Sequence, residues 1–111
     1  LPFKISWVED RGLDAKMLRL MKIRGDSMWP TMKDGDAVLI DTASLDVSDG
    51  DIYALVIGDT CRIKRLRKQY NGALTVMSDN PAPQYSDEVI PPDGSEHVMI
   101  IGHAVWRSGD L

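Results

Sequence analysis

The chain has 111 residues, 43% hydrophobic and 27% charged, which is typical of one globular domain with a single core. A formal net charge of −4 argues against a domain that binds nucleic acid by itself, and no apolar run approaches the roughly 20 residues that span a bilayer. The single cysteine, Cys61, excludes an internal disulfide, so a cytoplasmic location is expected. There is no signal-peptide pattern at the start, and because the chain begins with Leu1 we expect further sequence upstream.

The first expected element is a short helix that starts at Ser6. Serine here, with Glu9 three residues later, forms a capping-box pattern, and Gly12 is expected to end the helix. Residues 18–24 mix apolar and basic side chains and lead directly into Gly25, which predicts a strand followed by a tight corner.

The remaining chain predicts short strands joined by turns, because Asp, Asn and Gly recur between apolar runs. Strands are expected over residues 37–40, 52–57, 60–67, 73–77 and 98–106. The Asp-Gly turns at Asp34 and Asp49 are interpreted as the starts of two hairpins, and Gly102 as a bulge in the last strand. Together these signals predict one mostly β domain, an open or barrel-like antiparallel assembly with one small helix at the front.

The most unusual local pattern surrounds Ser27, which stands between Gly25 and Pro30. Glycine permits backbone conformations closed to other residues and proline fixes φ, so the serine hydroxyl is expected on a tight corner. A serine oxygen becomes a good nucleophile only when a neighbouring base accepts its proton, and a lysine can do this only when it is neutral. We therefore hypothesise a Ser27–Lys64 dyad, with the backbone N–H groups of Asp26 and Ser27 as donors to the oxyanion.

Lys64 lies in the middle of its expected strand. Because side chains alternate along a strand, Arg62 and Leu66 share its face, whereas Cys61 and Ile63 share the other face. Turning Lys64 inward beside Leu66 would remove water from its ammonium group and lower its pKa. By the same alternation, Cys61 is expected to be a buried thiol.

These residues also have simpler explanations. A serine flanked by Gly and Pro is often only a turn residue, and the basic run over residues 62–68 is equally compatible with a phosphate-binding patch. The aspartates over residues 34–51 lack the order of a calcium-binding loop, so turn chemistry explains them and no metal or other cofactor is expected. Trp29 is expected to be the most exposed tryptophan, and His97 and His103 are expected to be a surface and a strand residue.

Several longer motifs, taken in chain order, resemble one family. They are GDSMWPTM at 25–32, GDAVLID at 35–41, DGDIYA at 49–54, IKRL at 63–66, SDNP at 78–81 and IIGHAVW at 100–106. With these motifs the chain resembles, over nearly its whole length, the C-terminal domain of LexA and CI-like phage repressors. The 37-residue separation of Ser27 and Lys64 is similar to the spacing in that family.

This resemblance implies a LexA/signal-peptidase-like β-clip fold, shared with the UmuD mutagenesis proteins, over a single domain at residues 1–111. It implies a Ser–Lys peptidase that cuts its own chain when a RecA–single-stranded DNA filament stabilises the cleavable conformation, with Ser27 as nucleophile and Lys64 as general base. The family dimerises through this domain, so that N-terminal helix-turn-helix domains, absent from this chain, reach paired operator half-sites. A homodimer from a phage or prophage repressor is therefore expected.

The chain departs from the family pattern in two places. The usual scissile dipeptide, Ala-Gly or Cys-Gly, occurs nowhere in it, so the cleaved bond is expected upstream of Leu1. Residues 82–84 lengthen the segment before Tyr85, which predicts a local loop change. Two alternatives stay open, a dimerisation module with an idle dyad and a UmuD-like self-processing protein. A Gly-Asp-Ser lipase is disfavoured because its late Asp-x-x-His motif is missing.

Overall fold

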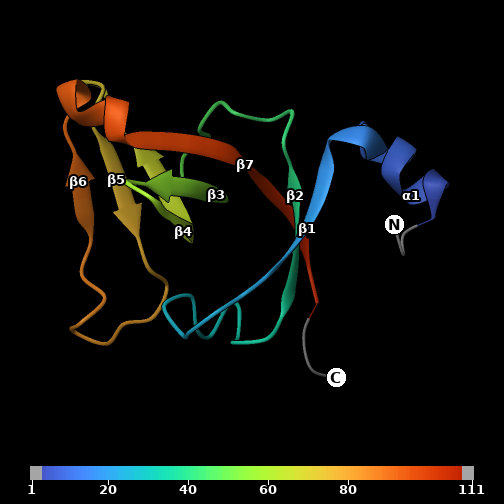
Figure 1. Cartoon of the computed structure of the whole chain (residues 1–111), viewed down its shortest axis with the longest axis horizontal. Helices are drawn as coiled ribbons and strands as arrows, with labels where there is room; N and C mark the ends of the chain where they lie inside the picture. The colour runs from blue at the N-terminus through green and yellow to red at the C-terminus, as the bar shows by residue number, and fades with distance from the viewer. Residues whose placement is uncertain (1–3, 109–111) are drawn as a thin grey trace.

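An antiparallel sheet of seven strands forms the frame of the molecule in the computed structural model (Figure 1). The structure describes residues 4–108, apart from the side chains of residues 95 and 96. The strands are β1 (Leu18–Lys22), β2 (Ala37–Asp41), β3 (Asp51–Ile57), β4 (Thr60–Lys68), β5 (Leu74–Met77), β6 (Glu88–Ile90) and β7 (Val98–Arg107). The helices are α1 (Ile5–Asp10) and the 3-10 helices η1 (Ala15–Met17) and η2 (Pro92–His97). No helix in this part of the chain is long and apolar enough to cross a membrane.

The last strand lies in the middle of the sheet, because the strand order is β1-β2-β7-β3-β4-β5-β6. Strand β7, orange to red in Figure 1, changes register once against β2 and once against β3, opposite Ala54 and Leu55. The bulge expected at Gly102 is therefore present directly beside this residue. A Cβ atom at Gly102 would lie 2.4 Å from the carbonyl oxygen of Asp41, so the close approach of the two strands requires glycine.

Hydrophobic side chains of the described residues form three clusters. One, around Met28 and Met32, lies beneath the connection between β1 and β2. A second surrounds Tyr53 and Leu66 between β3, β4 and β5, and a third packs α1 against β1 and β2 through Val8. Met28 and Met32 keep only 2% and 3% of their surface exposed. Burial of a side chain of this size contributes about 1.5–3 kcal/mol, so the two methionines fix the connection on the core.

The mostly β fold with a short helix near the N-terminus is confirmed, but three local expectations are wrong. The helix begins one residue before Ser6, with Lys4 at the N-cap and no side-chain cap hydrogen bond. The turn at Asp49 opens the β3–β4 hairpin as expected, but the strand that follows Asp34, β2, forms no hairpin with the next strand, β3, because β7 lies between them. The side chain of Cys61 is exposed, because Cys61 is the second residue of β4 and the buried part of this strand begins further along.

Candidate active site

The serine singled out in the sequence lies on the connection between β1 and β2, residues 23–36, which we name the Ser27 corner. The N–H of Ile23 donates to the carbonyl oxygen of Asp36 at 2.8 Å, so the two ends of the corner meet. Gly25 has a φ of 79°, a left-handed conformation that favours glycine. The sharp turn predicted before Ser27 is therefore present, and it leaves the serine side chain part-exposed above the buried methionines.

A cavity of about 380 Å³ opens beside the Ser27 corner, and both Ser27 and Lys64 line it. Residues 21–24, at the end of β1, form one wall, and residues 61–64 of β4 form the other. The fold thus brings to one cavity the two residues that are 37 positions apart in the sequence. Cys61 lines the same cavity, contrary to the expectation of a buried thiol.

The amine of Lys64 is held by a residue that the sequence analysis did not connect with it. Its Nζ donates a hydrogen bond of 2.7 Å to Oγ of Ser78. Within residues 4–108, this is the one hydrogen bond that the Lys64 side chain makes. Strands β4 and β5 pair Arg65 with Met77, so one further step of the antiparallel register puts Ser78 opposite Lys64. Opposite residues of an antiparallel pair extend to the same face, which explains the contact.

The surroundings of Lys64 disfavour its charged form. Burial lowers the pKa of the amine below its ordinary value of 10.5, and the positive charge of Arg62 lowers this pKa further. The carboxylate of Glu88 acts in the opposite direction. Glu88 lies 3.7 Å from the guanidinium of Arg62, in a pair whose side chains are 54% and 38% exposed, so solvent weakens its effect.

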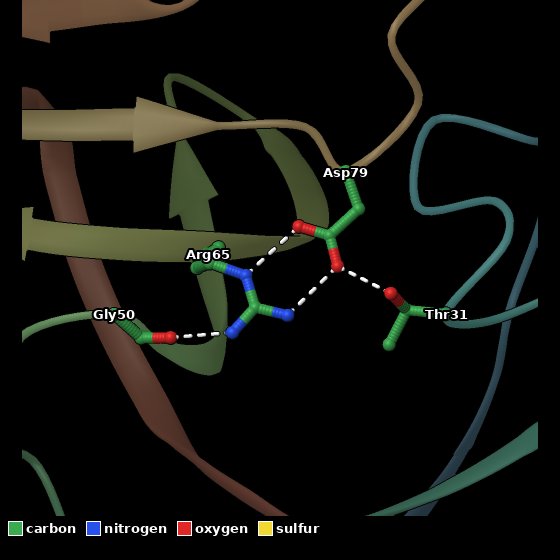
Figure 2. A network of polar contacts seen from close by, with 4 residues as sticks. All are labelled: Thr31, Gly50, Arg65 and Asp79. Carbon is green, nitrogen blue, oxygen red and sulfur yellow. Dashed lines mark hydrogen bonds and ion pairs between the residues drawn. The ribbon is translucent and has the colours of Figure 1, made fainter.

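A network around Arg65 and Asp79 joins the segment after β5 to the Ser27 corner (Figure 2). Two nitrogens of Arg65, Nε and Nη2, donate to the two carboxylate oxygens of Asp79, each at 2.8 Å. A third nitrogen donates to the carbonyl oxygen of Gly50, and the hydroxyl of Thr31 donates to Asp79 at 2.6 Å. The paired hydrogen bonds lower the pKa of Asp79 and raise the pKa of Arg65. Both groups are therefore charged at neutral pH.

Asn80, the next residue, contacts the backbone of the Ser27 corner directly. Its side-chain Nδ2 donates to the carbonyl oxygen of Asp26 at 2.9 Å, and its backbone N–H donates to the carbonyl oxygen of Ser27 at 3.0 Å. Its side-chain oxygen accepts from the N–H of Ala82, also at 3.0 Å. The hydroxyl of Tyr85 donates to the carboxylate of Asp26, so the loop after Asn80 returns to the corner.

These contacts occupy carbonyl groups of the corner and leave its nearby N–H groups available. Within the described residues, the backbone N–H groups of Asp26 and Ser27 donate to no protein acceptor. They are the donors expected for an oxyanion, and this role stays a prediction. The side chain of Trp29 is 48% exposed beside them, as expected. Among residues 4–108, no group of three or more His, Cys, Asp or Glu side chains could hold a metal ion.

The fold and the motifs place the chain in a known class. A model of the Peptidase S24-like family matches residues 1–105, so the chain belongs to this family. It is 30% identical over 110 residues to the HTH-type transcriptional regulator PrtR of Pseudomonas aeruginosa, which covers 97% of this chain and 43% of the relative. The resemblance to LexA and CI-like C-terminal domains is thereby confirmed.

Phage proteins are also among the relatives. The chain is 42% identical over 97 residues to the 26 kDa repressor protein of Escherichia phage HK022, covering 86% of this chain and 40% of the relative. It is 40% identical over 84 residues to the repressor protein CI of Enterobacteria phage phi80, covering 76% of this chain and 34% of the relative. The chain therefore spans less than half the length of the curated relatives that it matches.

Proposed function

We propose that this chain is the dimerising, self-cleaving C-terminal domain of a phage-type transcriptional repressor. The observation that carries the proposal is that Ser27 and Lys64 line one cavity, in which burial lowers the pKa of the lysine. The three relatives, whose names denote repressors and a transcriptional regulator, support a repressor more than a UmuD-like protein. The whole protein would act in the cytoplasm.

In the proposed reaction, neutral Lys64 accepts the proton of the Ser27 hydroxyl while the serine oxygen attacks the carbonyl carbon of the scissile bond. The N–H groups of Asp26 and Ser27 stabilise the negative oxygen of the tetrahedral intermediate. The ammonium of Lys64 then protonates the departing amine, and the C–N bond breaks to leave an ester on Ser27. Water, deprotonated by the same lysine, hydrolyses this ester and restores the hydroxyl.

Control of the reaction belongs to the whole protein. A RecA–single-stranded DNA filament is the proposed activator, and it would stabilise the conformation in which the scissile segment enters the cavity. Operator DNA would be bound by a helix-turn-helix domain outside this chain, and a homodimer would place two such domains on paired half-sites. Cleavage between the domains would then lower operator affinity by separating the DNA-binding domain from the dimerising domain.

Incubation of the full-length repressor at alkaline pH without an activator tests the proposal, because high pH deprotonates the lysine. Cleavage in the wild type that disappears in Ser27→Ala and Lys64→Ala supports a Ser–Lys peptidase. A folded wild type that stays intact from pH 7 to pH 10, but still dimerises, would favour the second candidate, a dimerisation module with an idle dyad. Trp29→Ala, an exposed change on the same corner, controls for general disturbance of the corner.

A further inference from the structure

Three consecutive residues, Ser78, Asp79 and Asn80, contact both halves of the candidate active site; we name them the clamp segment. Ser78 accepts a hydrogen bond from Lys64, and Asn80 donates two hydrogen bonds to carbonyl groups of the Ser27 corner. Lys64 and the Ser27 corner belong to different parts of the sheet, at β4 and between β1 and β2. The clamp segment contacts both of them and therefore contributes to their relative position.

The contact of Ser78 suits a lysine that must accept a proton. A neutral amine has two N–H bonds and one lone pair, and only the lone pair can accept the Ser27 proton. When one N–H is held by the Ser78 oxygen, rotation of the amine is restricted and its lone pair stays available to the cavity. The same hydroxyl can accept from the ammonium after proton transfer, so the contact is compatible with both protonation states.

Asn80 contacts the serine side of the candidate site. It is 9% exposed, and its backbone N–H, side-chain nitrogen and side-chain oxygen all make hydrogen bonds. Because Asn80 binds the carbonyl oxygens of Asp26 and Ser27, it fixes the orientation of the peptide groups on both sides of the Ser27 Cα. The first of these planar groups contains the N–H of Ser27, so its restraint also directs one of the two N–H groups that are expected to bind the oxyanion.

Asp79 makes the clamp segment rigid. Its carboxylate is 13% exposed and is held by two hydrogen bonds from Arg65 on β4 and one from Thr31 on the Ser27 corner. Figure 2 shows these contacts converging on Asp79 from separate parts of the chain. The middle residue of the segment is thus fixed to the strand that carries the lysine and to the corner that carries the serine.

We propose that the clamp segment aligns the two reacting groups, with Ser78 as a positioning residue for Lys64 and Asn80 as a positioning residue for Ser27. This inference rests on the proposed self-cleavage. Residues 78–80 would hold the nucleophile and the base in position without reacting themselves. We expect substitutions at the two ends of the segment to affect cleavage in different ways.

The test measures self-cleavage of the full-length protein between pH 7 and pH 10.5. In Ser78→Ala, the rate at the alkaline plateau should fall by about tenfold, because the amine loses its orientation. The midpoint of the pH profile should move to lower pH, because the ammonium loses a hydrogen bond that stabilises it. The defect should therefore be smaller at pH 7 than at pH 10. Ser78→Thr retains the hydroxyl and should restore both values.

Asn80→Ala should lower the plateau by about tenfold and leave the midpoint unchanged, because Asn80 contacts the serine side of the site. Ser86→Ala is the matched control, since Ser86 is an exposed serine in the same loop. It should change neither value. Thermal unfolding of each variant separates a local effect from loss of the fold. A Ser78→Ala profile that coincides with the Ser86→Ala profile would overturn the proposal.

A second measurement does not depend on cleavage. The pKa of Lys64 can be followed by NMR in protein with isotopically labelled lysine, with Lys64→Ala to assign the signal. A lower pKa in Ser78→Ala than in the wild type supports the contact, and an equal pKa overturns it. If the wild type does not cleave at any pH, the proposed function fails, whereas the titration still decides whether Ser78 holds the amine.

Discussion

Lys64 and Arg65 are adjacent on β4, and their side chains extend to opposite faces of the strand. The guanidinium of Arg65 makes two hydrogen bonds to the carboxylate of Asp79, and these bonds raise the pKa of Arg65. The amine of Lys64 contacts the neutral hydroxyl of Ser78, and burial lowers its pKa. One strand therefore carries one cation whose charge is stabilised and one whose charge is disfavoured.

This difference follows from what the two side chains can do. A guanidinium stays charged at any pH that a protein tolerates, so Arg65 is suited to a permanent link between distant segments. An ammonium loses its proton readily when it is desolvated, so Lys64 is suited to proton transfer. The link made by Arg65 also holds the segment that positions Lys64, so the two cations are connected through residues 78 and 79.

The largest expected effect comes from replacing the amine of Lys64 by a guanidinium. Lys64→Arg should lower alkaline self-cleavage by about 10³-fold at every pH, because a guanidinium cannot accept the serine proton. Gel analysis of cleavage between pH 7 and pH 10.5 measures this. Recovery of cleavage at the highest pH would contradict the assignment of Lys64 as base, provided that the variant unfolds at a temperature close to that of the wild type.

Removal of Asp79, the partner of Arg65, should reduce the stability of the fold. Asp79→Ala should lower the free energy of unfolding by about 2–3 kcal/mol, because Arg65 and Thr31 lose a part-buried carboxylate. Glu88→Ala, which removes the partner of Arg62 in the exposed pair, should cost less than about 0.5 kcal/mol. Denaturant unfolding compares the two variants. Equal losses would show that the Arg65–Asp79 pair contributes no more than a surface pair.

The Arg65–Asp79 pair should also make the free energy of unfolding depend on pH in the acidic range. The folded-state pKa of Asp79 lies below the ordinary value of 3.8, so its contribution to stability is present above that pH. The contribution is lost as the pH falls through the lowered folded-state pKa. The difference in unfolding free energy between the wild type and Asp79→Ala should therefore decrease on acidification.

Lys64 should make stability depend on pH in the alkaline range. Because its folded-state pKa is lowered, the folded protein binds fewer protons than the unfolded chain between that pKa and 10.5, and stability rises with pH across this window. Lys64→Met should lack this rise. The change should stay below about 1 kcal/mol, because solvent screens a part-exposed charge. Unfolding in urea at several pH values between 7 and 10.5 measures it, and parallel profiles for the two proteins would contradict it.

The smallest expected effects concern the two charges near the amine, and they have opposite signs. Arg62→Gln should move the pH midpoint of self-cleavage upward, because Arg62 lowers the pKa of Lys64. Glu88→Gln should move the midpoint downward, because Glu88 raises that pKa. At a fixed pH each rate should change by less than about tenfold, since salt and solvent screen charges near the surface. Loss of both shifts at high salt is expected, and shifts of the same sign would contradict this explanation.

Much of the strand pattern could be predicted from local signals. Glycine at positions 35, 50, 58 and 72 has positive φ in the structure, and each lies in an Asp-Gly, Gly-Asp or Asn-Gly pair between two of the expected strands. Strand β6 was not predicted, because three residues beside a proline carry too little periodicity. The insertion of β7 between β2 and β3 depends on long-range pairing, which no local pattern specifies.

Local patterns also identified only part of the candidate site. Ser27 and Lys64 were found from motif and spacing, and the structure brings them to one cavity. The SDNP motif was recognised, but Ser78 was not connected with Lys64, because that contact follows from the pairing of Arg65 with Met77. The expectation for Cys61 failed since alternation along a strand predicts which face a side chain shares, but not how far the core extends beneath it.

The central position of β7 has a consequence for the order in which the sheet can assemble. This strand follows β1 to β6 in the sequence, yet it supplies a ladder partner to both β2 and β3. Until it pairs, β1 and β2 can form only one hairpin, and strands β3 to β6 only a separate ribbon. We therefore expect the cavity between the Ser27 corner and β4 to form only once β7 has joined these two parts of the sheet.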